Sequence, residues 1–117
     1  MWLFTEYGFY SIVQKPGEDR LTVRARVKAD LDTLRERVPE LSPTVTGGGT
    51  DYPYRAFVSH EALAAGMAET VSSIDYSNFK NRVADNLGRS RESVYHRVWA
   101  ALMNLENTIM DKFRSGS

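Results

Sequence analysis

The eight residues from position 20 to 27 decide the fold, because their polarity alternates at every step: Arg20-Leu21-Thr22-Val23-Arg24-Ala25-Arg26-Val27. Apolar side chains fall on one side of this stretch and polar ones on the other. This two-residue period predicts a half-buried β-strand. We expect Leu21, Val23 and Val27 to face a layer of helices, and the arginines to lie on the opposite face of the sheet.

The chain before this strand is also rich in β-formers. Residues 2–14 are mostly aromatic and β-branched, which predicts one long strand. Gly8 lies within it and indicates a β-bulge. Residues 15–19 contain Pro16 and Gly17, which are typical of a turn. The two strands are therefore expected to form a hairpin.

After the hairpin the period changes to that of helices. Residues 28–38 predict a helix, and residues 43–46 and 52–59 predict a second hairpin whose tip contains Gly47 to Gly49. Ser59 and Asp75 are expected to cap two further helices, the second ending at Gly88. Ser90 is expected to cap the longest helix, at about 91–112.

The predicted order is β-β-α-β-β-α-α-α. We expect an α+β fold with a four-stranded antiparallel sheet of order 1-2-4-3 and helices on one face. The topology is that of a permuted ferredoxin-like sandwich (ββαββα) with a long C-terminal helix added. Residues 1–114 are expected to form a single domain, and residues 115–117 resemble a cloning remnant.

Composition narrows the classes of function. The 117 residues include 15 basic and 15 acidic ones, so no overall positive field attracts nucleic acid or anionic lipid. There is no cysteine, which excludes disulfides and thiol chemistry. No apolar stretch approaches the ~20 residues of a membrane span. We expect a cytoplasmic protein that needs no cofactor and no membrane.

Several segments support a resemblance that extends over nearly the whole chain. They are the opening Trp2-Leu3-Phe4-Thr5-x-x-Gly8-Phe9-Tyr10-Ser11, then Val23-Arg24-Ala25-Arg26, Thr50-Asp51-Tyr52-x-Tyr54-Arg55, Asp75-Tyr76-x-Asn78-Phe79-Lys80 and Val98-Trp99. In these segments the chain resembles a group of small uncharacterised bacterial proteins. The resemblance implies a single domain; it implies no activity and no catalytic residue.

Arg24, Arg26 and Arg55 form the most informative set, because alternation places all three on the sheet face away from the helices, together with Phe57. Basic and aromatic side chains on such a face can bind single-stranded RNA, with arginine on phosphate and bases on aromatic rings. The alternatives are another anionic ligand or a face without a ligand. In the last case the arginines pair with carboxylates, or the C-terminal helix or a second chain covers them.

Other candidate sites are weaker. Gly47-Gly48-Gly49-Thr50 could form an anion-binding nest, but three glycines between strands are more typical of a hairpin tip. Asp51, Asp75, His60 and His96 have no metal-ligand spacing, so no metal is expected. Tyr95, Trp99 and Leu102 belong to the apolar stripe of the last helix. Such a stripe is usually core, but any surplus is expected to contact a protein partner or a second copy.

The sequence contains no catalytic constellation, so it favours a non-enzymatic protein-binding or regulatory module, such as a phage or bacterial inhibitor or adaptor. The first alternative is a binder of single-stranded nucleic acid or of a phosphate ligand at Arg24, Arg26 and Arg55. The second is an unrecognised small enzyme with its site at the arginines or near Asp75.

Overall fold

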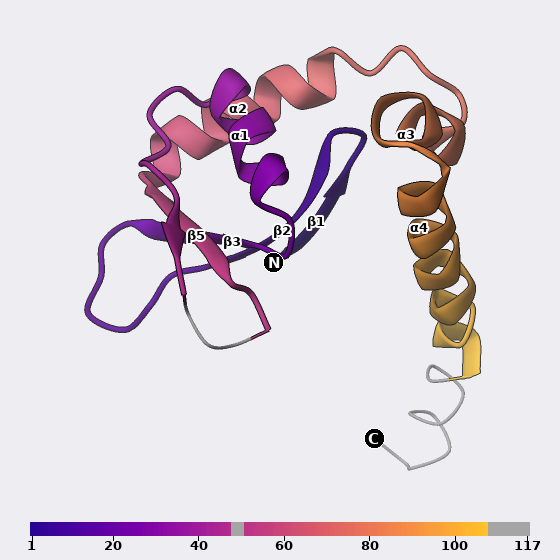
Figure 1. The fold of residues 1–117 in the computed structure, drawn as a ribbon, viewed down its shortest axis with the longest axis horizontal. Coiled ribbons are helices and arrows are strands. Elements are labelled where there is room, and N and C mark those ends of the chain that lie inside the picture. Colours follow the sequence, from indigo (N-terminus) through magenta and orange to yellow (C-terminus); the bar gives the residue numbers. More distant parts are fainter. Residues whose placement is uncertain (48–50, 108–117) are drawn as a thin grey trace. The chain divides into compact units, whose positions relative to one another are not determined.

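The computed structural model describes residues 1–47 and 51–107, which divide into two compact units, Met1–Ser77 and the helices from Asn78 onward. The first unit is α+β and the second is helical (Figure 1). The elements are, in order, β1 (Trp2–Thr5), β2 (Gly8–Val13), β3 (Leu21–Ala25), α1 (Lys28–Arg37), β4 (Val45–Thr46), β5 (Tyr54–Val58), α2 (His60–Ser72), α3 (Phe79–Leu87) and α4 (Arg89–Leu102).

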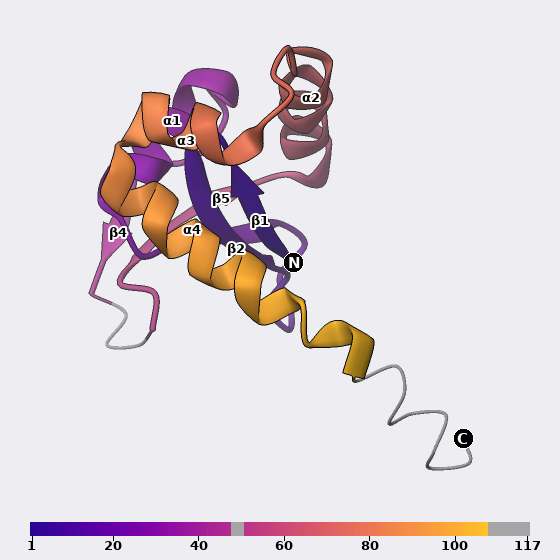
Figure 2. The same cartoon turned by 90° about the vertical axis from the view of Figure 1, so that its right-hand side faces the viewer.

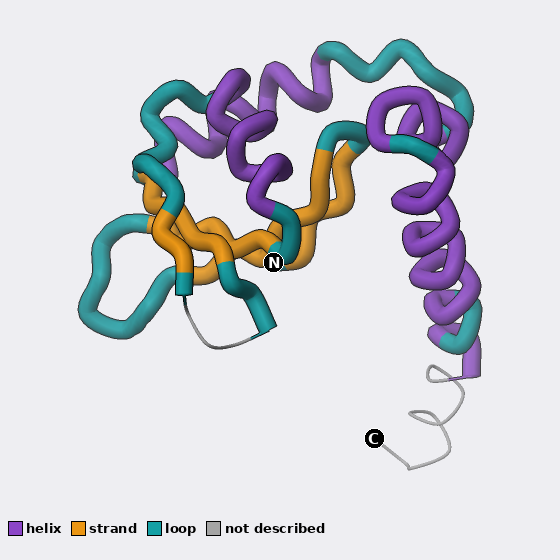
Figure 3. The backbone as a smooth tube through the Cα atoms, in the orientation of Figure 1, coloured by secondary structure: helices purple, strands orange, loops and turns teal. Residues whose placement is uncertain are grey.

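The strands of the described residues form one antiparallel sheet of order β1-β2-β3-β5-β4 (Figure 3). The α+β class and the antiparallel pairing are as predicted. The prediction of four strands is wrong, because residues 2–14 form two strands and not one. The rest of the order agrees with the prediction once this first run is divided.

Gly8 marks the β1–β2 turn and not a bulge (Figure 2 shows the two strands side by side). Thr5 closes the turn, because its hydroxyl donates to the Gly8 carbonyl at 2.9 Å and accepts the Tyr7 N–H at 3.2 Å. A Cβ atom at Gly8 would lie 2.5 Å from Tyr10 Oη. This close approach explains why residue 8 is a glycine. The turn is short, so the segments on either side of it keep the aromatic and β-branched composition that predicted a single strand.

The hydrophobic core lies between the sheet and α1 and α2, which occupy the same side of it (Figures 1 and 3). Its members from the sheet are Tyr10, Ile12, Val23, Ala25, Ala56 and Val58. Leu31, Leu34 and Leu63 join them from the helices, and Leu21 packs against the cluster. Val27 does not: it is 40% exposed and is the N-cap residue of α1, because the strand ends at Ala25.

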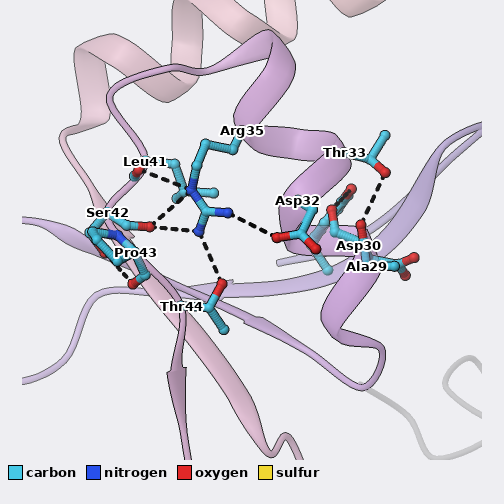
Figure 4. A network of polar contacts seen from close by, with 10 residues as sticks. Ala29, Asp30, Asp32, Thr33, Arg35, Leu41, Ser42, Pro43 and Thr44 are labelled. Atoms are coloured by element: carbon cyan, nitrogen blue, oxygen red, sulfur yellow. Dashed lines mark hydrogen bonds and ion pairs between the residues drawn. The ribbon is translucent and has the colours of Figure 1, made fainter.

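Arg35 fastens the end of α1 to the segment that leads into β4 (Figure 4). Its guanidinium donates to the Ser42 carbonyl at 2.6 Å and to Thr44 Oγ1 at 3.0 Å, and it pairs with Asp32 at 3.2 Å. Ser42 in turn pairs with Phe57 through main-chain and side-chain hydrogen bonds. This arginine therefore has a structural role and holds β4 and β5 in place.

The helix caps are partly as predicted. Ser59 caps α2 by accepting the Ala62 N–H at 3.1 Å. Asp75 does not cap α3; Asn78 does, accepting the Asn81 N–H at 2.9 Å. Ser90 is not a cap either, because α4 begins at Arg89 directly after Gly88, whose φ of 94° favours glycine.

The second unit is built on α3 and α4. Phe79 of α3 stacks on Tyr95 of α4 with ring centroids 5.9 Å apart, and Val83 is fully buried. The long C-terminal helix was expected at 91–112; α4 ends at Leu102, a short helical stretch follows at 105–107, and residues 108–112 lie outside the described part of the chain. Among the described helices, none has the length and apolar character needed to cross a membrane.

Candidate anion-binding site

The sheet face opposite α1 and α2, which we call the arginine face, carries the predicted arginines. Arg24 of β3 and Arg55 of β5 are directly paired, and Thr22 and Phe57 form the next pair on the same face. Since Val23, Ala25, Ala56 and Val58 are in the core, strand alternation places these four residues on the other side. The prediction of which side each residue occupies is therefore confirmed for β3 and β5.

A concavity of about 500 Å³ lies on the arginine face, and we call it the arginine site. Its lining residues are Trp2, Lys15, Arg24, Arg26, Asp51, Tyr52 and Arg55. Four cations thus stand against one carboxylate. The site is strongly positive although the whole chain is neutral.

Tyr52 organises the cations of the site. The guanidinium carbons of Arg24 and Arg26 each lie 4.8 Å from the centre of its ring, which is buried. A cation over an aromatic face contributes about 0.5–2 kcal/mol, depending on how far it is desolvated. Tyr52 therefore brings two positive charges together that would otherwise repel each other.

Hydrogen bonds fix the two arginines further. Arg24 Nη2 donates to Ser11 Oγ at 2.6 Å, and Arg26 Nη1 donates to the Asp51 carbonyl at 3.0 Å. Both acceptors are uncharged. Neither Arg24 nor Arg26 forms an ion pair with any described carboxylate. Among the described residues, the alternative in which carboxylates pair with the arginines is therefore not observed for these two.

Phe57 shares the arginine face but does not line the arginine site. Its ring lies under the guanidinium of Arg20, 4.0 Å from ring centre to Cζ. Arg20 also pairs with Glu18 at 3.9 Å. The structure therefore brings Arg24, Arg26 and Arg55 together as predicted and places Phe57 under a different cation.

The predicted partner residues of α4 differ from one another. Tyr95 is buried against Phe79, whereas Trp99 and Leu102 are about half exposed. Trp99 stacks on His96 at 5.3 Å, and Lys80 Nζ lies 4.5 Å from its ring centre. Lys80 also contacts His96 Nδ1 at 3.1 Å.

The other candidates do not form a site in the described residues. No group of three or more His, Cys, Asp or Glu side chains is placed to hold a metal within residues 1–47 and 51–107. Of the proposed glycine nest, Gly48, Gly49 and Thr50 lie outside the described residues.

Sequence reasoning missed Trp2, Lys15 and Tyr52 as members of the site. The position of Trp2 was predictable, because it is next to Leu3 in β1. Leu3 packs against the core, so the neighbouring side chain lies on the opposite face of the sheet. The position of Tyr52 was not predictable from alternation, because this residue precedes β5 and its ring reaches the arginine face from outside the regular strand. Lys15 is brought in by the turn after β2.

Comparisons with known proteins add no further information on the site. Neither models of protein families, nor curated proteins, nor solved structures gave a match to this chain.

Proposed function

We propose that the chain is a binding module whose arginine site holds a phosphate-bearing ligand. The observation that carries the proposal is the pairing of Arg24 and Arg26 on one buried ring, without a carboxylate partner among the described residues. Folding has brought like charges together and oriented them. Arginine guanidinium groups are suited to phosphate, because they can donate two parallel hydrogen bonds to its oxygens.

Arg55 and Lys15 add to this preference from two other elements. Both line the same concavity, so a bound anion would face four cations from β3, β5 and the turn after β2. Among the described lining residues Asp51 is the one that is acidic, and its main-chain carbonyl accepts a hydrogen bond from Arg26. A polyanion fits this charge distribution better than a neutral ligand.

Calorimetric titration with inorganic tripolyphosphate tests the proposal. We expect saturable binding that weakens as salt rises from 50 to 200 mM, since the interaction is electrostatic. The double variant Arg24→Gln/Arg26→Gln should lose most of the affinity. The matched control is Arg89→Gln/Arg97→Gln, which removes the same charge from α4 and should leave binding unchanged. Equal loss in both variants, or no binding at 50 mM salt, would contradict the proposal.

A second candidate function, contact with a protein, is favoured by α4. Its exposed apolar side chains include Val94, Trp99 and Leu102, and the exposed Met103 follows directly after the helix. The unit from Asn78 to Ser117 is 40 residues long, close to the length of about 40 below which chains usually need a disulfide, a metal or association to remain folded. We propose that a second copy of the chain covers this apolar side of α4.

Light scattering over a concentration series tests this second candidate. The expected result is a dimer at high micromolar concentration that Leu102→Lys converts to a monomer. A monomeric mass for the unaltered chain throughout the series would exclude it.

We also propose that the topology is that of a permuted ferredoxin-like sandwich. The succession β3-α1-β4-β5-α2, with β2 beside β3, has the order expected of a permuted ferredoxin-like sandwich, with β1 as an added edge strand. In several modules of that architecture the sheet face away from the helices binds the ligand, which supports the assignment of the arginine face as the binding surface.

A further inference from the structure

Next to the arginine site lies a group of aromatic rings, Trp2, Phe4 and Phe9, which we call the aromatic ladder. Trp2 pairs with Ser11 and Phe4 pairs with Phe9 across β1 and β2. Leu3 and Tyr10 pack into the core, so alternation places the ladder on the arginine face. The Phe4 and Phe9 rings stack at 4.5 Å, and Trp2 meets Phe9 edge to face at 6.2 Å.

The ladder leaves a large aromatic surface in water. Trp2 is 68% exposed, and Phe4 and Phe9 are only partly buried. Burying such a ring elsewhere would stabilise the fold, and the exposed arrangement forgoes this stabilisation. An exposed ring that continues into partly buried rings is typical of a surface that receives a partner with flat apolar faces.

The ladder and the arginine site are continuous. Trp2 belongs to the ladder and also lines the concavity. The register places Trp2, Ser11, Arg24 and Arg55 in one row across β1, β2, β3 and β5. Neighbouring strands lie about 4.8 Å apart, so Trp2 and Arg24 are separated by roughly 10 Å across the sheet.

We infer that the ligand is a single-stranded nucleic acid, with backbone phosphates at Arg24, Arg26 and Arg55 and bases on the aromatic ladder. The inference rests on the proposed function and names its ligand class. A small phosphate compound would fill the concavity that Trp2 lines and would leave Phe4 and Phe9 without contact. A duplex is unsuitable, because its base faces are covered by their neighbours, whereas unpaired bases can stack on protein rings.

Phe57 is not expected to stack on a base of the ligand. That ring is already covered by Arg20 on one face, with 4.0 Å between the guanidinium carbon and the ring centre. Phe57→Ala therefore serves as the matched control for Trp2→Ala. Both substitutions remove one aromatic ring from the same sheet face, but only Trp2 belongs to both the ladder and the site.

Fluorescence anisotropy with labelled 12-nucleotide RNA and DNA of mixed sequence tests the inference on the full chain. Three phosphate contacts predict a slope of about −2 in log K against log salt. Trp2→Ala should weaken binding roughly 5- to 150-fold, the range for one stacked base, whereas Phe57→Ala should change it less than about twofold. Trp2→Phe, which keeps a ring, should retain most of the affinity. The RNA and DNA arms show whether the sugar matters.

A second readout does not depend on affinity. The chain has two tryptophans, so Trp99→Phe leaves Trp2 as the single indole. Its emission should be quenched more strongly by the oligonucleotide than by tripolyphosphate, which fills the concavity that Trp2 lines but has no base to stack on the ring. Circular dichroism of Trp2→Ala should match that of the unaltered chain, because the side chain is exposed.

The outcomes separate the two proposals. Binding of tripolyphosphate without binding of either oligonucleotide would overturn the inference and leave the proposed function standing. Oligonucleotide binding that is insensitive to Trp2→Ala would do the same. Failure of both probes to bind at 50 mM salt would overturn the inference together with the proposed function.

Discussion

The two faces of the sheet differ in what their side chains accomplish. On the face that α1 and α2 cover, which we call the covered face, Val23, Ala25 and Ala56 are completely buried. On the arginine face, Arg24 lies over the ring of Tyr52 and Arg55 lines the same concavity. In β3 the odd-numbered residues thus contribute to the core, whereas Arg24 lies on the face where we propose that the ligand binds. The comparison teaches that the proposed binding residues occupy the strand positions that the core does not use.

The largest expected effect comes from placing a charge on the covered face. Val23→Asp buries a carboxylate that finds no cation among its core neighbours, which should cost about 4 kcal/mol of unfolding free energy. Arg26→Gln, on an exposed residue of the same chain segment, should cost less than about 1 kcal/mol. Urea denaturation measures both. Similar losses in the two variants would mean that the faces are not distinct in this way.

A smaller effect is expected where α2 approaches α1. A Cβ atom at Gly66 would overlap Cγ2 of Val38, which is buried. Gly66→Ala should therefore destabilise the fold by about 1–2 kcal/mol, because overpacking costs about 1–3 kcal/mol and the helix preference of alanine returns part of this.

A double-mutant cycle sharpens this second prediction. In a Val38→Ala background the overlapping methyl group is gone, so Gly66→Ala should become neutral or stabilising. Thermal unfolding of the unaltered chain, the two single variants and the double variant gives the coupling free energy between the two positions. Equal effects of Gly66→Ala in both backgrounds would show that the two helices do not approach each other through this glycine.

The sequence predicted the covered face better than the arginine face, and the reason is physical. Burial imposes a period on a strand, so Val23 and Val58 could be assigned from alternation alone. The same pattern placed Arg24, Arg26 and Arg55 on the opposite face, because they lie between the apolar positions. Tyr52 did not, because a ring that reaches a sheet from a loop obeys no period.

The division of residues 2–14 into two strands was missed for a related reason. Thr5 and Gly8 form the turn through side-chain hydrogen bonds and close packing against Tyr10, and neither leaves a pattern in composition. The cap of α3 is Asn78, three residues after the predicted Asp75, and the cap of α4 is Gly88, two residues before the predicted Ser90. All four residue types are suitable caps, so composition alone does not choose among neighbouring positions.

The smallest expected effect concerns Tyr7, whose ring packs in the core cluster and whose hydroxyl contacts Thr70 Oγ1 at 2.8 Å. Burial raises the pKa of this hydroxyl above its usual value of 10, although the hydrogen bond to Thr70 and the charge of Arg37 act in the opposite direction. The folded state therefore disfavours the ionised form. The stability that Tyr7 contributes is fully present below pH 10 and is lost as the pH rises from 10 through the pKa of the folded state. Tyr7→Phe has no proton to lose, so the difference in unfolding free energy between the unaltered chain and the variant should shrink from pH 9 to pH 11. Because both proteins share the remaining tyrosines, their common titration cancels in this difference. A difference that stays constant over this range would show that the Tyr7 hydroxyl ionises as readily in the folded chain as in the unfolded one.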